Sequence, residues 1–300
     1  MNDRGRRLRR RSKAGATSKR RITDRSAHYA LRVPDPKRPT RPPSRPRRSP
    51  AAPSAWDRQA TWYDGWVGGQ GSRYHQGIVL PVALDLLDPR NGEEILDVGA
   101  GQGVLAPAVV RSGARYTGVD ASPRLIEAAR RRHGGAGHFV VGDARRLSAT
   151  RELHQGGYDA AAFVLSIQDM DPLEPLFESL DWVLRPVSRV VIVMTHPAFR
   201  QPRHSGWGFD ESRKLTYRRV DAYLTPMDVP MKSVGGSAPT RSFHRPLSDY
   251  VNGLAVYGFA IDAMREPGDL PEGERPGKRP ARGKADAEIP LFLALRARRG

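Results

Sequence analysis

The chain has no cysteine among its 300 residues. This absence excludes disulfides, thiolate metal sites and a cysteine nucleophile, and it fits a cytoplasmic protein. Long hydrophobic runs are also missing: none approaches the roughly 20 apolar residues of a membrane-spanning helix. The N-terminus lacks the apolar core of a signal peptide. We therefore expect a cytoplasmic protein without a membrane span and without a metal site.

Acidic residues are scarce at the start of the chain. Residues 1–50 hold 18 Lys/Arg and 3 Asp/Glu, a net charge of +15, whereas the remainder holds 32 and 29, a net charge of +3. Because residues 1–53 are rich in Pro and Arg and show little apolar periodicity, we expect a disordered basic tail. It is either an electrostatic arm for RNA, DNA or an acidic partner, or an extension without function upstream of a mis-called start.

From Trp56 onward, apolar segments typical of strands alternate with segments whose apolar residues recur at helical spacing. The predicted strands 158–167 and 189–195 are continuous apolar runs, as expected for a parallel sheet with helices on both faces. One α/β domain is therefore predicted over residues 54–300. Residues 199–246 interrupt the alternation without a clear period, and we predict a cap insertion over the carboxyl edge of the sheet. The predicted strands are 93–98, 115–120, 138–144, 158–167, 189–195, 259–267 and 289–299.

The stretch "EEILDVGAGQGVLA" places a strand, three alternate glycines and a helix in succession. Gly99, Gly101 and Gly103 permit positive φ angles and close approach of a ligand to the backbone. The third glycine comes one residue too early for the dinucleotide fingerprint. Asp97, two residues before the loop, would repel a pyrophosphate but could hold an ammonium group. The loop thus favours a zwitterionic or cationic ligand, with a simple tight turn as the alternative.

Two further acids follow predicted strands. Asp120 ends the second strand, where a carboxylate can accept hydrogen bonds from both hydroxyls of a ribose. Asp143 follows the third strand, where it can accept from an adenine amino group. Ligands of parallel sheets bind outside the carboxyl ends of the strands. The set therefore describes a nucleoside with an amino-acid arm, although Asp120 alone could cap a helix and Asp143 alone could be a surface acid.

These segments resemble a known family. "ILDVGAGQG", "GVDAS", "VGDA" and "HRPLSDYVNGLAVYGF" resemble motifs of the class I S-adenosylmethionine-dependent methyltransferases, in particular the type-11 group. The resemblance covers Trp56 to Arg299. It implies S-adenosyl-L-methionine as the cofactor and a Rossmann-like, seven-stranded, mostly parallel sheet whose last strand is antiparallel.

The same resemblance implies roles for individual residues. The methionyl part would be held by the glycine loop and Asp97, and the ribose by Asp120 beside Ala121. Asp143 and Ala144 would border the adenine. The full predicted cofactor set is Asp97, Gly99, Gly101, Gly103, Asp120, Ala121, Asp143 and Ala144.

The methyl acceptor is less constrained. The segment "LSIQDMDP" differs from the Asn/Asp-Pro-Pro-aromatic loop of enzymes that methylate nucleobase amines, and the missing cysteine excludes the covalent route to 5-methylpyrimidines. A hydroxyl acceptor needs a base. We favour His244, then His196 and His75, each of which could instead be structural. The aromatic residues that could form the wall of an acceptor pocket are Trp62, Tyr63, Tyr74, Trp207 and Tyr217. The cap arginines that could bind an anionic acceptor are Arg203, Arg213, Arg218, Arg219 and Arg241.

We therefore predict a methyltransferase that acts on a small organic acceptor. Two alternatives remain. The first is an RNA methyltransferase that uses residues 1–53 as a nucleic-acid arm. The second is a protein that binds S-adenosylmethionine without catalysis, which would keep the glycines and Asp120 but have no usable acceptor cavity.

Overall fold

The computed structural model describes residues 55–231, 239–269, 285 and 288–300. These residues all belong to one compact unit. The expected basic tail and most of the loop between the last two predicted strands lie outside the described residues. None of the described helices is long and apolar enough to cross a membrane.

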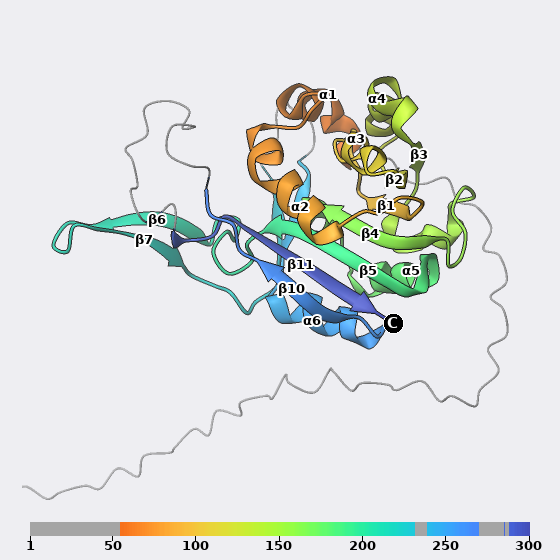
Figure 1. Ribbon diagram of the computed structural model, residues 1–300. Coiled ribbons are helices and arrows are strands. Elements are labelled where there is room, and N and C mark those ends of the chain that lie inside the picture. The colour runs from red at the N-terminus through yellow and green to blue at the C-terminus, as the bar shows by residue number, and fades with distance from the viewer. Residues whose placement is uncertain (1–54, 232–238, 270–284, 286–287) are drawn as a thin grey trace, which may run out of the picture. The chain divides into compact units, whose positions relative to one another are not determined.

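A seven-stranded sheet forms the centre of the molecule, with the order β10-β11-β5-β4-β1-β2-β3 (Figure 1). β11 runs antiparallel to both neighbours, and the other described pairs of this sheet are parallel. This confirms the predicted sheet and its antiparallel last strand. The strands are β1 (Glu94–Val98), β2 (Arg115–Asp120), β3 (His138–Val141), β4 (Tyr158–Val164), β5 (Leu184–Thr195), β10 (Ala260–Arg265) and β11 (Phe292–Arg299).

Helices cover both faces of this sheet, and each face has its own buried apolar cluster. One face packs against η1 (His75–Val79), α2 (Leu80–Leu87), α3 (Ala106–Arg111) and α4 (Pro123–His133). The other packs against η3 (Ala144–Ala149), η4 (Ile167–Asp169), α5 (Glu174–Val183) and α6 (Leu247–Val256). The remaining described helices are α1 (Ala55–Val67) and η2 (Gly134–Ala136). Cover on both faces explains the continuous apolar runs 160–164 in β4 and 190–194 in β5.

The start of α4 follows directly from its sequence. Ser122 is extended and its hydroxyl accepts a hydrogen bond from the Leu125 N–H, so it satisfies one of the free N–H groups at the helix start. Pro123 occupies the first helical position, where no N–H is needed. This cap sets α4 directly after the end of β2, beside the glycine loop.

The cap insertion is more regular than its sequence indicates. It contains two antiparallel hairpins, one of β6 (Ser205–Asp210) with β7 (Leu215–Val220) and one of β8 (Met227–Pro230) with β9 (Arg241–His244). Figure 1 shows the β6–β7 hairpin projecting away from the sheet. The sequence shows no clear period here because two glycines in β6 and a proline in β8 interrupt the alternation of side chains in these paired strands.

Candidate functional site

The glycine loop lies at the carboxyl end of β1, and its three glycines serve different needs. A Cβ on Gly99 or Gly103 would lie only 2.5 Å from a neighbouring side-chain carbon, so packing requires glycine at both positions. A Cβ on Gly101 would meet nothing closer than Tyr63 Cε1, at 3.7 Å. Gly101 also has a φ of +54°. It is therefore the loop glycine that leaves backbone open to a ligand.

Asp97, in β1, has one satisfied and one unsatisfied oxygen. Its Oδ2 accepts a hydrogen bond of 2.7 Å from the Tyr116 hydroxyl, on the adjacent strand β2. Its Oδ1 is buried and has no hydrogen-bond partner among the described residues. Burial raises the pKa of Asp97 to about 7, against the hydrogen bond from Tyr116 and with a contribution from the charge of Asp120. An ammonium group would supply both the donor and the charge that Oδ1 lacks.

Asp120 ends β2 and ties the loop to α4. Its Oδ2 accepts from the Gly101 N–H at 2.9 Å, and its Oδ1 accepts from the Ser122 N–H at 2.8 Å. A carboxylate oxygen can accept two hydrogen bonds, so each keeps capacity for one ligand hydroxyl. Burial raises the pKa of Asp120 even though both backbone donors favour its charged form.

Asp143 has a different environment. It caps η3, and its two oxygens accept from Nε and Nη2 of Arg145 at 3.0 and 2.9 Å. Burial opposes the change, but the hydrogen bonds and charge of Arg145 hold the pKa of Asp143 below its usual range. Ala144 beside it is buried, whereas Ala121 is exposed. An adenine amino group at Asp143 would share the carboxylate with Arg145.

Helix α1 lies against the glycine loop and α4. Asp57 Oδ1 accepts from the Ser122 hydroxyl at 2.9 Å and from the Arg124 N–H at 3.1 Å. The Gln102 amide donates to the Gly68 carbonyl, just after α1. Tyr63 thereby sits over Gly101, where burial first, then the charges of nearby aspartates, raise the pKa of its hydroxyl.

The short helix η4 follows β4 and contacts the glycine loop. The Ser166 hydroxyl, at its N-cap, donates to the Val98 carbonyl at 2.6 Å. Asp169 has a pKa well above its usual range because it is removed from water, with a further contribution from Asp120. Arg245 is buried, and its Nη2 donates to the Met170 carbonyl at 2.8 Å and to Asp171 Oδ1 at 2.6 Å. Arg245 thereby fixes the chain that leaves η4.

A narrow cleft lies beyond η4, beneath the cap. Its cavity volume is about 20 Å³, and the open space around it brings the total to about 280 Å³. Its walls come from η4, the end of β5, the segment after β5, β9 and α6. Polar side chains in these walls include Gln168, Thr195, Arg200, His244 and Tyr250.

The structure places the three candidate histidines in different settings. His244 lines the cleft, and its Nε2 lies 2.7 Å from the Tyr223 carbonyl. His196 Nε2 lies 2.9 Å from Glu266 Oε1, and its Nδ1 accepts from the Ala198 N–H at 3.2 Å. His75 is buried in η1, where burial lowers its pKa to about 4. Of the three, His244 is the one that lines the cleft.

The cap arginines are bound mainly to the cap itself. Arg241 pairs with Asp228, and Arg219 pairs with Asp221. Arg213 lies beside Asp210, at the hairpin turn. The other two reach backbone carbonyls: Arg203 Nη2 donates to Pro230 and Arg218 Nε to Phe199.

The five aromatic residues of the expected acceptor wall are spread over the domain. Tyr63 lies at the glycine loop, whereas Tyr74 packs its edge against Phe292. In the cap, the guanidinium groups of Arg200 and Arg218 each lie over the ring of Trp207. Trp62 and Tyr217 are exposed. The acceptor wall therefore remains a prediction, and Tyr63 is the member that lies beside the cofactor residues.

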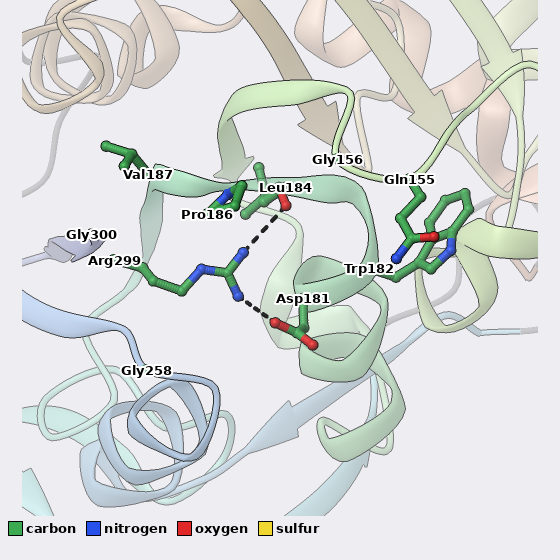
Figure 2. Close-up of a pocket in the computed structure, with 10 residues that line it drawn as sticks. All are labelled: Gln155, Gly156, Asp181, Trp182, Leu184, Pro186, Val187, Gly258, Arg299 and Gly300. Atoms are coloured by element: carbon green, nitrogen blue, oxygen red, sulfur yellow. Dashed lines mark hydrogen bonds and ion pairs between the residues drawn. The ribbon is translucent and has the colours of Figure 1, made fainter. Parts of the chain in front are cut away.

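A larger hollow opens at the opposite edge of the sheet, with about 1040 Å³ of empty space open to solvent. Figure 2 shows Arg299 reaching from this edge to the carboxylate of Asp181 and the carbonyl of Leu184. Leu184 is the first residue of β5, so the hollow lies at the amino end of that strand. Ligands of parallel α/β sheets bind at the carboxyl ends, which favours the glycine loop and the narrow cleft as the functional site.

The doubly covered sheet, the glycine loop after β1 and the acid at the end of β2 together define the class I S-adenosylmethionine-dependent methyltransferases. Residues 95–187 match the family described as "Methyltransferase domain". This match confirms the resemblance to the class that the sequence motifs indicate.

Individual relatives agree with this assignment. The chain is 32% identical over 116 residues to a demethylmenaquinone methyltransferase of Tropheryma whipplei, covering 38% of this chain and 47% of that protein. It is 29% identical over 142 residues to a ubiquinone biosynthesis O-methyltransferase of Xylella fastidiosa, covering 45% and 56%. The chain thus spans about half the length of these curated relatives. An S-adenosylmethionine-dependent methyltransferase from Mesorhizobium loti superimposes with a TM-score of 0.58 at 25% identity, covering 73% of this chain and 96% of that one.

The residues present fit S-adenosylmethionine, the cofactor of this class. The buried free oxygen of Asp97 suits the ammonium of the methionyl arm, and Gly101 leaves the backbone open above it. Asp120 keeps acceptor capacity for ribose hydroxyls. The sequence missed Tyr116 and the residues of η4. For η4, the sequence offered one indication, because the segment follows a predicted strand and therefore lies at the same edge of the sheet as the glycine loop.

Proposed function

We propose that the protein transfers a methyl group from S-adenosylmethionine to a hydroxyl or amine of a small organic acceptor bound in the narrow cleft. The proposal rests mainly on η4, which joins the two sites. Its N-cap Ser166 binds the backbone of β1 beside the glycine loop, and two residues later Gln168 lines the cleft. A ligand in the cleft would thus lie across one turn of helix from the cofactor residues.

His244 supports a role as the base. A carbonyl oxygen only accepts hydrogen bonds, so the Tyr223 carbonyl requires the proton of His244 on Nε2. The other nitrogen, Nδ1, then carries a lone pair and has no hydrogen-bond partner among the described residues. Burial lowers the pKa of His244, against the hydrogen bond to Tyr223, so the imidazole is neutral at neutral pH. It can take the proton that the acceptor loses.

When bound, the cofactor supplies the methyl group on a sulfonium and leaves as a thioether. The protein's part is to align the acceptor atom with that group, which is a large share of catalysis in such displacements. His196 is less suited to proton transfer, because its Nδ1 already accepts a hydrogen bond and its Nε2 is held by Glu266. The names of two relatives, a demethylmenaquinone methyltransferase and a ubiquinone biosynthesis O-methyltransferase, support a quinone-related acceptor.

Titration calorimetry with S-adenosylhomocysteine tests the cofactor half of the proposal. We expect one site per chain with a dissociation constant in the micromolar range, because a pre-formed cradle meets the ligand's ammonium and ribose. The cofactor assignment fails if the folded protein shows no binding below millimolar concentration. Methyl transfer from labelled S-adenosylmethionine to a panel of small hydroxyl and amine compounds then tests the activity.

The RNA alternative rests on the +15 charge of residues 1–50. We expect the full chain to bind RNA with a steep salt dependence, since each phosphate contact releases a counterion. Deletion of residues 1–53 should remove that binding while leaving the affinity for S-adenosylhomocysteine unchanged. Methyl incorporation into RNA by the full chain, lost on deletion, would contradict the small-molecule proposal in favour of the RNA alternative.

A further inference from the structure

Asp169 brings a carboxylate without a partner to the turn that packs on the glycine loop. It is the last residue of η4. A Cβ on Gly99 would lie 2.5 Å from Ser166 Cβ and 2.8 Å from Met170 Cε, so side chains on both sides of Asp169 in the sequence abut the loop. Among the described residues, no hydrogen bond or ion pair involves the Asp169 carboxylate, and the residue keeps accessible surface.

Asp169 lies close to two groups of the cofactor site. The Tyr63 ring lies over Gly101, and after burial the charge of Asp169 is the largest influence that raises the pKa of the Tyr63 hydroxyl. The pKa of Asp169 is itself raised by burial and then by the charge of Asp120. Asp169 is therefore near the loop glycine that is open to a ligand and near the acid that would hold the ribose.

The charges that act on this site have one sign. Asp97, Asp120 and Asp169 lie around it, and no basic side chain among the described residues contributes to the raised pKa values of these acids or of Tyr63. S-adenosylmethionine carries two positive charges, an ammonium and a sulfonium. The free buried oxygen of Asp97 suits the ammonium. The sulfonium joins the methionyl arm to the ribose, so it would lie between the groups that Asp97 and Asp120 hold, and it still lacks a counter-charge.

We propose that Asp169 faces the sulfonium and makes the site prefer the charged cofactor over the neutral thioether product. This inference rests on the cofactor part of the proposed function. A carboxylate without a partner inside a protein is stabilised by a nearby positive charge. The same positive charge offsets the burial and the repulsion by Asp120 that raise the pKa of Asp169, so a cationic ligand favours its ionised form.

Methyl transfer removes the charge that Asp169 recognises. The sulfonium becomes a thioether, so the product keeps its ammonium at Asp97 and its ribose at Asp120 but loses the attraction to Asp169. Fresh cofactor should therefore displace the product readily. Asp169 is in this way a specificity-determining residue of the cofactor site, and it takes no proton from the acceptor.

The test compares three ligands of the full chain that share the adenosine and the amino-acid arm. S-adenosylmethionine has a sulfonium, sinefungin has a protonated amine in place of the sulfonium methyl, and S-adenosylhomocysteine has a neutral sulfur. Titration calorimetry at pH 8 without an acceptor gives the three dissociation constants. We expect the two cationic ligands to bind about 10-fold more tightly than the neutral one, the gain of one contact between charged groups. Asp169→Asn should lower this ratio to about 2-fold or less, because Asn keeps the shape of the side chain and removes its charge.

Asp97→Asn is the matched control, because all three ligands carry the ammonium that Asp97 would hold. It should weaken all three by a similar factor and leave their ratio unchanged. An affinity for S-adenosylhomocysteine no weaker than that of the wild type shows that Asp169→Asn is folded, and Asp169→Ser repeats the measurement with a smaller side chain.

Three results would overturn the inference: equal binding of the three ligands by the wild type, a ratio that survives both Asp169 variants, or a ratio that falls as far in Asp97→Asn as in Asp169→Asn. The last would assign the preference to the overall negative charge of the site. Failure of the wild type to bind any of the three ligands would instead contradict the cofactor assignment itself, and this inference with it.

Discussion

Replacing Asp97 by Asn is expected to weaken S-adenosylhomocysteine binding by about 10- to 100-fold while making the ligand-free protein more stable. A hydrogen bond to a charged group contributes about 1.5–3 kcal/mol, and Asn offers the ammonium an oxygen without a charge. The same substitution removes a carboxylate that is buried with an unpaired oxygen. Function and stability should therefore change in opposite directions at this position.

The stability gain has a defined pH dependence. The pKa of Asp97 is about 7 in the folded chain against an ordinary value of 3.8, so the folded state holds the proton more tightly than the unfolded state. The wild type therefore loses stability as pH rises from about 4 to about 7, at up to about 1.4 kcal/mol per pH unit. The gain in Asp97→Asn should be largest at pH 8 and nearly absent at pH 4. Thermal unfolding of the ligand-free proteins at both pH values measures it.

Asp143→Asn is the control with the opposite sign. Arg145 holds the pKa of Asp143 below its usual value of 3.8. The ionised carboxylate therefore stabilises the folded state at pH values above 3.8, and this stabilisation is lost as the pH falls through the lowered pKa. Asp143→Asn should lower the melting temperature at pH 8. If Asp97→Asn also lowers it, the interpretation of Asp97 as an unpaired buried acid is wrong.

Cofactor binding should itself depend on pH. An ammonium ligand requires ionised Asp97, so wild-type affinity for S-adenosylhomocysteine should fall as pH drops below about 7. The slope should reach about tenfold per pH unit, because one proton must leave on binding. Calorimetry from about pH 5 to about pH 8, a window that spans this pKa, should show the slope in the wild type and its loss in Asp97→Asn.

The second large effect concerns His244. His244→Gln should lower kcat for methyl transfer by about 10²- to 10⁴-fold, the usual contribution of a general base. Gln can still donate to the Tyr223 carbonyl but cannot take a proton. Affinity for S-adenosylhomocysteine should not change, since His244 lies in the cleft and not at the glycine loop. The measurement is transfer of labelled methyl groups to an acceptor found in the panel of hydroxyl and amine compounds.

The pH profile distinguishes a base from a structural histidine. Burial lowers the pKa of His244 from its usual 6.5, so the wild-type rate should fall only below that pH, where the imidazole gains a proton. His244→Gln should lack this acid limb. His196→Gln is the comparison: it breaks the contact with Glu266 and should lower stability while changing kcat only a few-fold. A comparable loss of kcat in His196→Gln, with His244→Gln active, would reverse the two assignments.

The sequence alone determined the architecture and the cofactor edge. Both depend on local patterns: apolar strands, an N-cap serine before a proline, and glycines at alternate positions. Once the strands are parallel, the residues that follow them must meet at one edge. The acids Asp97, Asp120 and Asp143 could therefore be placed near each other without coordinates. The cap hairpins could not be predicted, because their strands carry no clear alternation and exist through pairing with one another.

Only the tertiary structure decided which groups at that edge are free to act. The Asp97 oxygen that lacks a partner is defined by Tyr116, nineteen positions away and on another strand. The free nitrogen of His244 is defined by the Tyr223 carbonyl, and the occupied nitrogens of His196 by Ala198 and Glu266. Residue type and spacing are local properties of a chain. Hydrogen-bond satisfaction, proton position and pKa depend on the neighbours that folding brings together, and the chemistry of this site follows from them.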